Sequence, residues 1–439
     1  MKTRSSEGVA LSGTPESSTG NGMNDEDCAK PFRISKREVW NAYKRVKENR
    51  GAAGIDGQSI AEFEENLSRN LYKLWNRLSS GSYFPMPVRR VEIPKGDGKT
   101  RPLGIPTVTD RIAQMVVKRF LEPILEPQFH ADSYGYRPGK SAKDALGVAR
   151  QRCWKYDWVL DLDIKGFFEA IDHELLMRAV RKHTTCSWVL LYISRWLRVP
   201  AQLTDGSHIE RTQGTPQGGV ISPLLANLYL HYCFDLWMKR EFRAIPFERY
   251  ADDVICHCGS EAQAIQLKRA IDERFSACHL ELHPQKTKIV YCKDDRRKEE
   301  FPIVQFSFLG YAFRPRGVRG NGGAILTGFT PAISPESANS IRSTMRRWCV
   351  HRRCDLSLEE IAQGVNPIIR GWINYYGVYY RSALYRIFNH FDVSLSRWTR
   401  KKYRHLKGHR TRACEWLRCV QKRQPHLFAH WSMLPSVVG

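Results

Sequence analysis

The sequence lacks any apolar stretch that approaches the roughly 20 residues needed to cross a bilayer. It also lacks the charged-then-apolar order of a secretory signal at its N-terminus. Its 12 cysteines are scattered without a repeated Cys-x-x-Cys pattern, which argues against a disulfide scaffold and favours reduced thiols. We therefore expect a cytoplasmic protein with no membrane partner.

Acidic residues are scarce relative to basic ones. The chain has 45 Asp and Glu against 69 Lys and Arg, which gives a net charge of +24. The imbalance is concentrated near the C-terminus, where residues 331–439 contain 19 Lys and Arg but 6 Asp and Glu. Such an excess predicts a polyanionic partner.

Against this basic background, the segment Tyr250-Ala251-Asp252-Asp253 places two adjacent carboxylates at the tip of an apolar segment. Burying an unpaired carboxylate costs several kcal/mol or shifts its pKa, so such a pair needs a cation or solvent. Magnesium prefers oxygen ligands and is commonly shared between one or two carboxylates and substrate phosphates. The alternative is a solvated hairpin turn between two strands, because Asp is a common turn residue.

Residues 158–168 favour the metal over the simple turn. Their alternation of apolar and acidic residues predicts a strand that ends at Gly166, with Asp161 and Asp163 on one face. If this strand lies beside the 250–253 hairpin, its carboxylate completes a two-metal site that activates a 3′-hydroxyl and stabilises the transferring phosphate. Nucleotide polymerisation is then the leading chemistry.

Eight segments of the chain, taken in order, resemble the reverse transcriptases encoded by bacterial group II introns, which also act as intron maturases. The segments are 51–57 (GAAGIDG), 93–106 (IPKGDGKTRPLGIP), 133–140 (SYGYRPGK), 163–168 (DIKGFF), 214–224 (GTPQGGVISPL), 250–253 (YADD), 282–287 (LHPQKT) and 308–311 (FLGY). The resemblance implies an α+β fold: a right-hand polymerase whose fingers and antiparallel palm sheet precede an α-helical thumb and maturase domain.

The resemblance also implies the catalytic residues. Asp163, Asp252 and Asp253 would bind two Mg²⁺ ions. We prefer Asp163 to Asp161 because Asp163 begins the DIKGFF segment, and Asp253 would contribute less to direct ligation. Phe168 matches the position whose ring lies under the sugar and disfavours a 2′-hydroxyl; its alternative role is core packing.

Four further residues are expected to contact the nucleotide or template. Lys95 and Arg101 lie in a Gly-rich basic turn and would hold the triphosphate of the incoming nucleotide, although the turn alone reads as a solvated hairpin. Gln217 precedes two glycines that allow close backbone approach. The resemblance implies that Lys286 assists pyrophosphate departure as a general acid, with Lys288 as a competing candidate.

RNA contacts are expected in two places. In residues 134–140, aromatic side chains alternate with Arg137 and Lys140, a pattern that suits stacking and phosphate binding but also occurs in structural loops. Residues 397–404 form the strongest basic run, with Arg397, Arg400, Lys401, Lys402 and Arg404. Phosphate contacts there would make binding sensitive to salt, whereas most isolated basic runs are merely solvated.

The chain is long enough for several domains. We expect a disordered tail over 1–33 and a helical N-terminal extension over 34–90 that contacts template and intron RNA. Fingers and palm would cover 91–315, a Gly- and Arg-rich linker 316–329, and the thumb 330–439. The segments 341–348, 365–376 and 385–398 have the apolar spacing of helices.

The resulting hypothesis is an RNA-directed DNA polymerase that binds group II intron RNA and promotes its splicing and mobility. Its partners would be the intron RNA, an RNA template with a DNA primer, deoxynucleoside triphosphates and target DNA. Two alternatives stay open: a maturase that acts in splicing alone, and a host-adopted reverse transcriptase in defence or repair. We expect no C-terminal HNH endonuclease domain, and hence priming from existing DNA ends. The oligomeric state has no readable signature.

Overall fold

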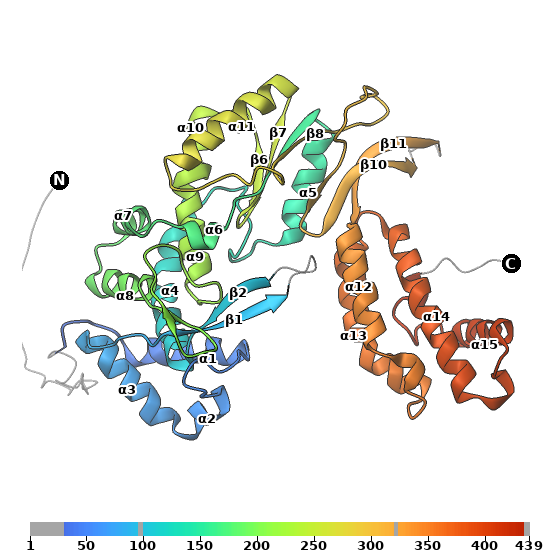
Figure 1. The fold of residues 1–439 in the computed structure, drawn as a ribbon, viewed down its shortest axis with the longest axis horizontal. Coiled ribbons are helices and arrows are strands. Elements are labelled where there is room, and N and C mark those ends of the chain that lie inside the picture. Colours follow the sequence, from blue (N-terminus) through green and yellow to red (C-terminus); the bar gives the residue numbers. More distant parts are fainter. Residues whose placement is uncertain (1–29, 95–99, 320–323, 434–439) are drawn as a thin grey trace, which may run out of the picture.

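The computed structural model describes residues 30–94, 100–319 and 324–433 (Figure 1). Most of the predicted disordered tail and residue Lys95 lie outside these ranges. The first described elements are three helices, α1 (Lys36–Glu48), α2 (Ile60–Glu65) and α3 (Leu67–Ser80). Helix α1 buries Val39, Tyr43 and Val46 and packs along α4 (Val108–Leu125). Helices α1 and α2 therefore flank the 51–57 segment.

A small sheet follows, with strand order β2-β1-β4-β5. Its strands are β1 (Val88–Pro94), β2 (Thr100–Ile105), β4 (Ala201–Gln202) and β5 (His208–Ile209). Strands β1 and β2 form an antiparallel hairpin in which Ile93 pairs with Arg101. This hairpin carries Arg101 at its outer end.

The central sheet has four antiparallel strands in the order β6-β7-β3-β8. They are β3 (Trp158–Leu162), β6 (Phe247–Tyr250), β7 (Asp253–Cys258) and β8 (Lys288–Tyr291). Because side chains alternate along a strand, Leu160 and Cys256 pack toward α11 (Glu261–Ser276), whereas Val159 and Ile255 pack toward α5 (Ala142–Cys153). Both faces of the sheet are thus buried.

The prediction that the first of these strands ends at Gly166 was wrong, because β3 ends at Leu162. The carbonyl of Asp163 leaves the ladder and accepts a hydrogen bond from the backbone N–H of His283, at 2.8 Å. Gly166 then adopts a positive φ of 55° and precedes the short helix α6 (Phe167–Ala170). Asp163 therefore lies just beyond the strand, at the end of the sheet.

Further helices complete this body on the side of the central sheet that faces away from the C-terminal helices (Figure 1). They are η2 (Glu126–Gln128), α7 (His173–His183), α8 (Ser187–Leu197), α9 (Ser222–Leu230), the π-helical turn η3 (His231–Asp235) and α10 (Leu236–Glu241). Their apolar faces share one core with the N-terminal helices and with one face of the central sheet.

The predicted linker over 316–329 was also wrong. Residues 316–319 belong to strand β10 (Tyr311–Arg319) and residues 325–329 to strand β11 (Ile325–Ile333), which pair as a long hairpin with β9 (Phe306–Phe308) beside β10. Pairing runs from Tyr311 with Ile333 out to Arg319 with Ile325. The hairpin shares its core with α5, so it joins the central sheet to the helices that follow.

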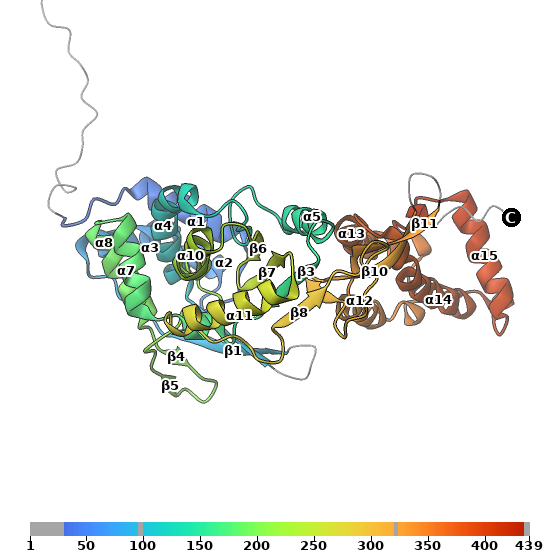
Figure 2. The ribbon, with the colours of Figure 1, turned by 90° about the horizontal axis from the view of Figure 1, so that it is seen from above.

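The C-terminal helical domain lies at the opposite end of the molecule from α7 and α8 (Figure 2). It contains α12 (Pro335–Arg347), η4 (Val350–Arg352), α13 (Leu358–Tyr376), η5 (Arg381–Leu384), α14 (Tyr385–Lys402), η6 (Arg404–Leu406), α15 (Arg410–Arg423) and η7 (Trp431–Met433). Trp398 and Phe391 are fully buried in a core separate from that of the larger body. Within the described ranges, no helix has the length and apolar character to span a membrane.

Candidate active site

The Asp252–Asp253 pair lies at the turn between β6 and β7, as predicted for a hairpin tip. Tyr250 pairs with Asp253 across the turn. Ala251 has a φ of +59°, a conformation that costs free energy for a residue with a side chain. Such a turn persists only if its surroundings hold it in place.

Arg249 supplies part of that support. Its fully buried guanidinium donates to Asp235 through Nε at 2.7 Å and through one terminal nitrogen at 2.6 Å. The other terminal nitrogen donates to Asn227 Oδ1 at 2.9 Å and to the Ala251 carbonyl at 3.1 Å. This bidentate pair ties the turn to η3 and α9. Sequence reasoning missed the role of Arg249, whose one signal was a basic residue inside an apolar strand.

Gly135 allows a second segment to pack on the turn. A Cβ atom at this position would lie 2.4 Å from the backbone nitrogen of Ala251 and 2.9 Å from the carbonyl carbon of Tyr250. The Gly135 carbonyl accepts a hydrogen bond from Asn227 Nδ2 at 2.6 Å. Residues 133–136 thus form a wall of the site. This close packing requires glycine at position 135, because any side chain there would collide with the turn.

The third carboxylate comes from the neighbouring strand, as the sequence suggested. Strand β3 pairs with β7, and Asp163 follows β3 directly. Lys286 Nζ donates to Asp163 Oδ2 at 3.0 Å, and the Asp163 backbone N–H donates to Thr287 Oγ1 at 3.4 Å. The loop 282–287 therefore fixes Asp163 from both sides.

The two competing lysines occupy different positions. Lys286 contacts Asp163, whereas Lys288 lies opposite Asp161 in the ladder between β3 and β8. Lys288 lowers the pKa of Asp161, although burial and the charges of Asp253 and Asp163 together hold that pKa well above its usual range. The geometry assigns Lys286, rather than Lys288, to the end of the sheet where Asp163 lies.

The carboxylates at this end of the sheet repel one another. Burial, then the charges of Asp252 and Asp163, raises the pKa of Asp253 to about 7. Burial also raises the pKa of Asp252, an effect to which Asp163 adds and which Arg101 opposes. Anionic oxygen ligands in a partly desolvated site favour a hard divalent cation.

These residues fit a divalent cation by their donor chemistry. Within the described part of the chain, no three His, Cys, Asp or Glu side chains form a ready-made metal cage. Magnesium does not need one, because it binds one or two carboxylates and takes its remaining ligands from water and substrate phosphates. The Asp163, Asp252 and Asp253 set is suited to such a shared site.

Phe168 and its neighbour Phe167 differ in how deeply their rings pack into the core. Phe167 is buried in the main core, while Phe168 is only partly buried, and the two rings meet edge to face at 5.5 Å. The Phe168 carbonyl accepts a hydrogen bond from the Thr215 backbone N–H at 2.7 Å. Phe167 therefore lies within the core, whereas Phe168 packs against it and keeps part of its surface exposed.

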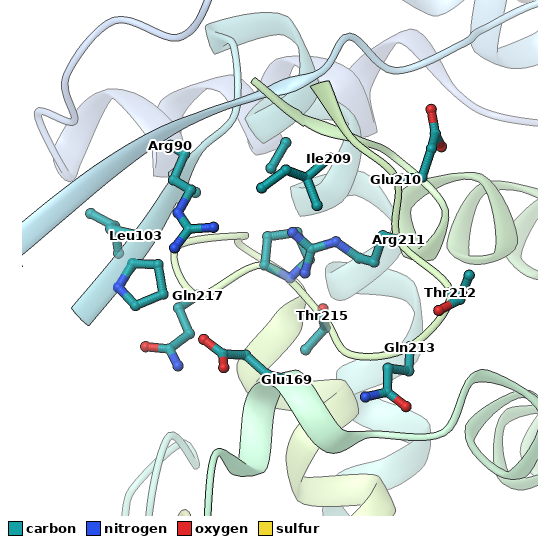
Figure 3. A pocket seen from close by; sticks show the side chains of 14 residues that line it. Arg90, Leu103, Glu169, Ile209, Glu210, Arg211, Thr212, Gln213, Thr215 and Gln217 are labelled. Carbon is teal, nitrogen blue, oxygen red and sulfur yellow. The ribbon is translucent and has the colours of Figure 1, made fainter. Parts of the chain in front are cut away.

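Gln217 lies at the boundary between the central body and the β1–β2 hairpin. Its carbonyl accepts from the Gly104 N–H at 2.7 Å, and Gly218, with φ +114°, approaches the Gly104 carbonyl closely. Beside it is a cavity of about 210 Å³, into which the side chains of Gln217, Glu169 and Arg211 project (Figure 3). The two glycines after Gln217 thus serve close packing of backbone on backbone.

Arg101 and Tyr136 both lie near Asp252. Burial, and then the charge of Asp252, raises the pKa of Tyr136. The charge of Arg101 opposes the rise in pKa at both Tyr136 and Asp252. Tyr136 is 54% exposed and its ring lies 6.4 Å from that of Tyr250. Sequence reasoning did not select Tyr136, although its segment was noted for alternating aromatic and basic residues.

The two groups of expected RNA contacts have different outcomes. The Arg137 side chain is 6% exposed and is already paired with Glu126 and with the carbonyls of His130 and Ser133, so it offers no free cation to RNA. Lys140 Nζ donates to the Ala131 carbonyl at 3.0 Å and keeps part of its surface exposed. Arg137 is thus a structural residue.

In the basic run at the end of α14, Arg397, Lys401 and Arg404 are exposed. Lys402 instead donates to the carbonyls of Cys354 at 2.8 Å and Leu356 at 3.0 Å. Arg400 is half-buried, with an Nε that has no hydrogen-bond partner within the described residues. Three of the five predicted residues therefore present a freely accessible cation.

Comparison with known proteins agrees with this geometry. Residues 93–313 match the family described as reverse transcriptase (RNA-dependent DNA polymerase), and residues 338–416 match the group II intron, maturase-specific domain. The first match covers the central sheet with its three acids. The second covers most of the C-terminal helical domain.

Three curated proteins illustrate the relationship. Protein YkfC of Escherichia coli (strain K12) is 34% identical over 307 residues, covering 60% of this chain and 80% of YkfC. The group II intron-encoded protein LtrA of Lactococcus lactis subsp. cremoris is 37% identical over 206 residues, 46% of this chain and 34% of LtrA. The uncharacterized 91 kDa protein in cob intron of Schizosaccharomyces pombe is 26% identical over 438 residues, covering 84% of this chain and 53% of that protein.

An antiparallel sheet with acids at one end, followed by a helical domain, is the right-hand arrangement of a polymerase, with the sheet as palm and the helices as thumb. The chain belongs to the reverse transcriptase family, among the members that carry a group II intron maturase domain.

Proposed function

We propose that this protein is the RNA-directed DNA polymerase of a group II intron and that it also binds the intron RNA to promote splicing and mobility. The observation that carries the polymerase assignment is the meeting of Asp163, Asp252 and Asp253 at one end of the palm sheet. Its substrates are deoxynucleoside triphosphates and an RNA template with a DNA primer; target DNA is a further partner.

Divalent cations, two Mg²⁺ ions in this proposal, supply activation of the primer 3′-hydroxyl and charge stabilisation when bound by the three acids. The chain's own residues orient the substrate. Arg101, on the outer part of the β1–β2 hairpin, is placed to pair with the nucleotide phosphates. Phe168 provides an aromatic surface beside the site, where a ring under the sugar excludes a 2′-hydroxyl.

Lys286 has two states in this proposal. Without substrate its ammonium neutralises Asp163, at 3.0 Å. With Asp163 engaged in holding the cations, the Lys286 ammonium would be free to reach the phosphates and donate its proton to the departing pyrophosphate. The side chain is 59% exposed, so this movement needs no rearrangement of the core.

The test is primer extension on an RNA template, with Asp252→Ala compared with the wild type. Loss of a metal ligand removes several kcal/mol of transition-state stabilisation, so extension should fall about a thousandfold or more. RNA binding, measured by fluorescence anisotropy, should change little because the basic surface is intact. Asp272→Ala, an exposed acid on α11, is the matched control.

If the wild type binds RNA tightly but does not extend the primer, a protein that acts in splicing alone replaces the polymerase assignment. If Asp252→Ala extends as well as the wild type does, the site assignment is wrong. Full activity of the Asp272→Ala control is required before either result is interpreted.

A further inference from the structure

A pocket outside the polymerase site is lined by four arginines. It has a volume of about 480 Å³ and lies between β10, the first half of α12 and the start of α14. Arg314 and Arg316 come from β10, Arg342 from α12 and Arg386 from α14. We call this feature the arginine pocket.

Strand alternation explains why β10 contributes two of these arginines. Tyr311 and Phe313 point into the core shared with α5. Ala312, Arg314 and Arg316 therefore face the opposite side, toward the thumb helices. The pocket is therefore formed in part by β10, which extends into the region predicted as a linker.

Its charge is not balanced by acids. No Asp or Glu lines the pocket, and none of the four arginines forms an ion pair with any carboxylate in the described ranges. Arg314 and Arg386 are exposed and Arg316 and Arg342 are partly buried. By contrast, Arg137 pairs with Glu126 and Arg249 with Asp235. Clustered guanidinium groups without counter-charges repel one another, and an anion between them would relieve that repulsion.

Arg316 is the most constrained member. It donates to the carbonyls of Thr330 and Ala312, each at 3.3 Å, and its guanidinium lies 5.5 Å from the ring of Tyr380. Burial, and then the charge of Arg314, lowers its pKa to about 10. The structure thus holds a partly desolvated cation in a fixed orientation beside another cation.

The shape of the pocket limits what can enter. Its volume is that of a small-ligand site, not of an open face. The flexible backbone of a single strand can bend its phosphates into a pocket of this size more readily than a regular double helix can. Tyr380 and Ser382 add an aromatic ring and a hydroxyl, which suit a ribose or base next to the phosphates.

We propose that the arginine pocket binds consecutive backbone phosphates of a single-stranded or sharply bent RNA segment and anchors that RNA where the β10–β11 hairpin meets the thumb. This inference rests on the proposed function, because it specifies a site for the RNA that the protein binds. The site is distinct from the exposed basic residues at the end of α14.

The test compares two charge-matched double variants. Arg314→Gln with Arg386→Gln removes two pocket charges, and neither side chain makes a hydrogen bond within the described part of the chain. Arg346→Gln with Arg347→Gln removes two exposed charges from α12 outside the pocket. Thermal unfolding of both variants verifies that the fold is retained.

Binding of a fluorescent single-stranded RNA is measured by anisotropy over a range of salt concentrations. The pocket variant should bind about tenfold more weakly than the wild type, with the slope of log K against log salt reduced by about 1.4 for two lost phosphate contacts. The control should lose no more than about twofold. Inorganic tripolyphosphate should raise the melting temperature of the wild type and of the control, but not that of the pocket variant.

Equal losses in the two double variants would overturn the inference, since the pocket would then act only as general positive charge. Stabilisation by tripolyphosphate without any loss of RNA binding in the pocket variant would also overturn it, in favour of a small-anion site. Failure of the wild type in primer extension is a separate readout, because it rejects the polymerase assignment without affecting this comparison.

Discussion

At the scale of single residues, Asp253 shows how burial and charge act together in the site. Its carboxyl group is removed from water and lies close to Asp252 and Asp163, while a hydrogen bond from the Leu309 backbone partly offsets the effect. An acid whose pKa is higher in the folded than in the unfolded state binds extra protons in the folded state. Between about pH 4 and pH 7 the folded protein therefore loses stability as the pH rises.

This sign gives a prediction for Asp253→Asn in buffer without divalent cations. The variant should be more stable than the wild type at pH 8, on the order of 2–4 kcal/mol, because the buried charge is gone. The difference should disappear near pH 4, where the native carboxyl is neutral. Urea unfolding at both pH values measures it, with Asp272→Asn as the exposed control; equal stability at pH 8 would refute the assigned environment.

Residue identity alone selected acids that lie together in the structure, but it did not separate exposed arginines from arginines paired with acids. The short motifs selected Asp163, Asp252 and Asp253, and the structure brings all three together. The same kind of reasoning selected Arg137, which proves to be saturated by Glu126, and passed over Arg249, which holds the turn. Whether an arginine faces solvent or a buried carboxylate depends on partners distant in sequence, which no local pattern reports.

At the scale of elements, the hairpin formed by β6 and β7 depends on neighbours on two sides. Arg249 ties the hairpin to η3 through Asp235, and residues 133–136 pack against the hairpin through Gly135. The strained Ala251 is therefore held by contacts from η3, from α9 and from residues 133–136. Any change that displaces one of these segments should move the two acids.

Gly135→Ala should impair catalysis more than stability. Its Cβ would collide with the backbone of Ala251 and Tyr250, so the hairpin or the 133–136 wall must shift. A displacement approaching 1 Å at reacting groups costs about a hundredfold in rate, whereas overpacking costs about 1–3 kcal/mol. Single-turnover primer extension and thermal unfolding measure the two effects.

Gly364→Ala is the control for this substitution. It lies within α13, has open space around the new Cβ and should be neutral or slightly stabilising. If Gly135→Ala retains the wild-type rate, the proposed role of the 133–136 wall is incorrect.

Periodicity predicted elements well where apolar residues were frequent. It located α12, α13 and α14 within the thumb and the strand that carries Asp161. It failed for β10 and β11, because glycine and arginine obscure alternation and disfavour a strand by local propensity. The long antiparallel pairing of β10 with β11 compensates for this low strand propensity. Helix α15 was missed because it buries few residues, Ala413 and Leu417, and so has little apolar periodicity.

At the scale of the whole molecule, the thumb is connected to the active site through the junction at Leu309. The Tyr375 hydroxyl, from α13, donates to the Leu309 carbonyl at 2.9 Å. The Leu309 backbone contacts the carboxylate of Asp253, and the Tyr311 hydroxyl returns to the Tyr375 carbonyl. Thumb position and carboxylate position are therefore mechanically linked.

Tyr375→Phe should weaken this link without removing any charge. Loss of one hydrogen bond to a buried carbonyl costs about 1 kcal/mol, which corresponds to about a fivefold change. We expect shorter extension products per binding event, with less effect on addition of the first nucleotide. Extension under single-binding conditions with a trap measures this.

The control is Tyr385→Phe, whose hydroxyl makes no hydrogen bond within the described ranges. Product lengths for Tyr375→Phe equal to those of this control would show that the Leu309 contact does not couple the thumb to the palm.

The strand order of the central sheet has a consequence for how the chain folds. Strand β3 lies between β7 and β8, yet the ribosome makes residues 158–162 long before residues 253–258 and 288–291. During synthesis, both edges of the apolar strand β3 therefore remain unpaired until β7 and β8 have been made. Such delayed, long-range pairing folds slowly and exposes a strand to aggregation, so the nascent protein should depend on chaperones until its last palm strand emerges.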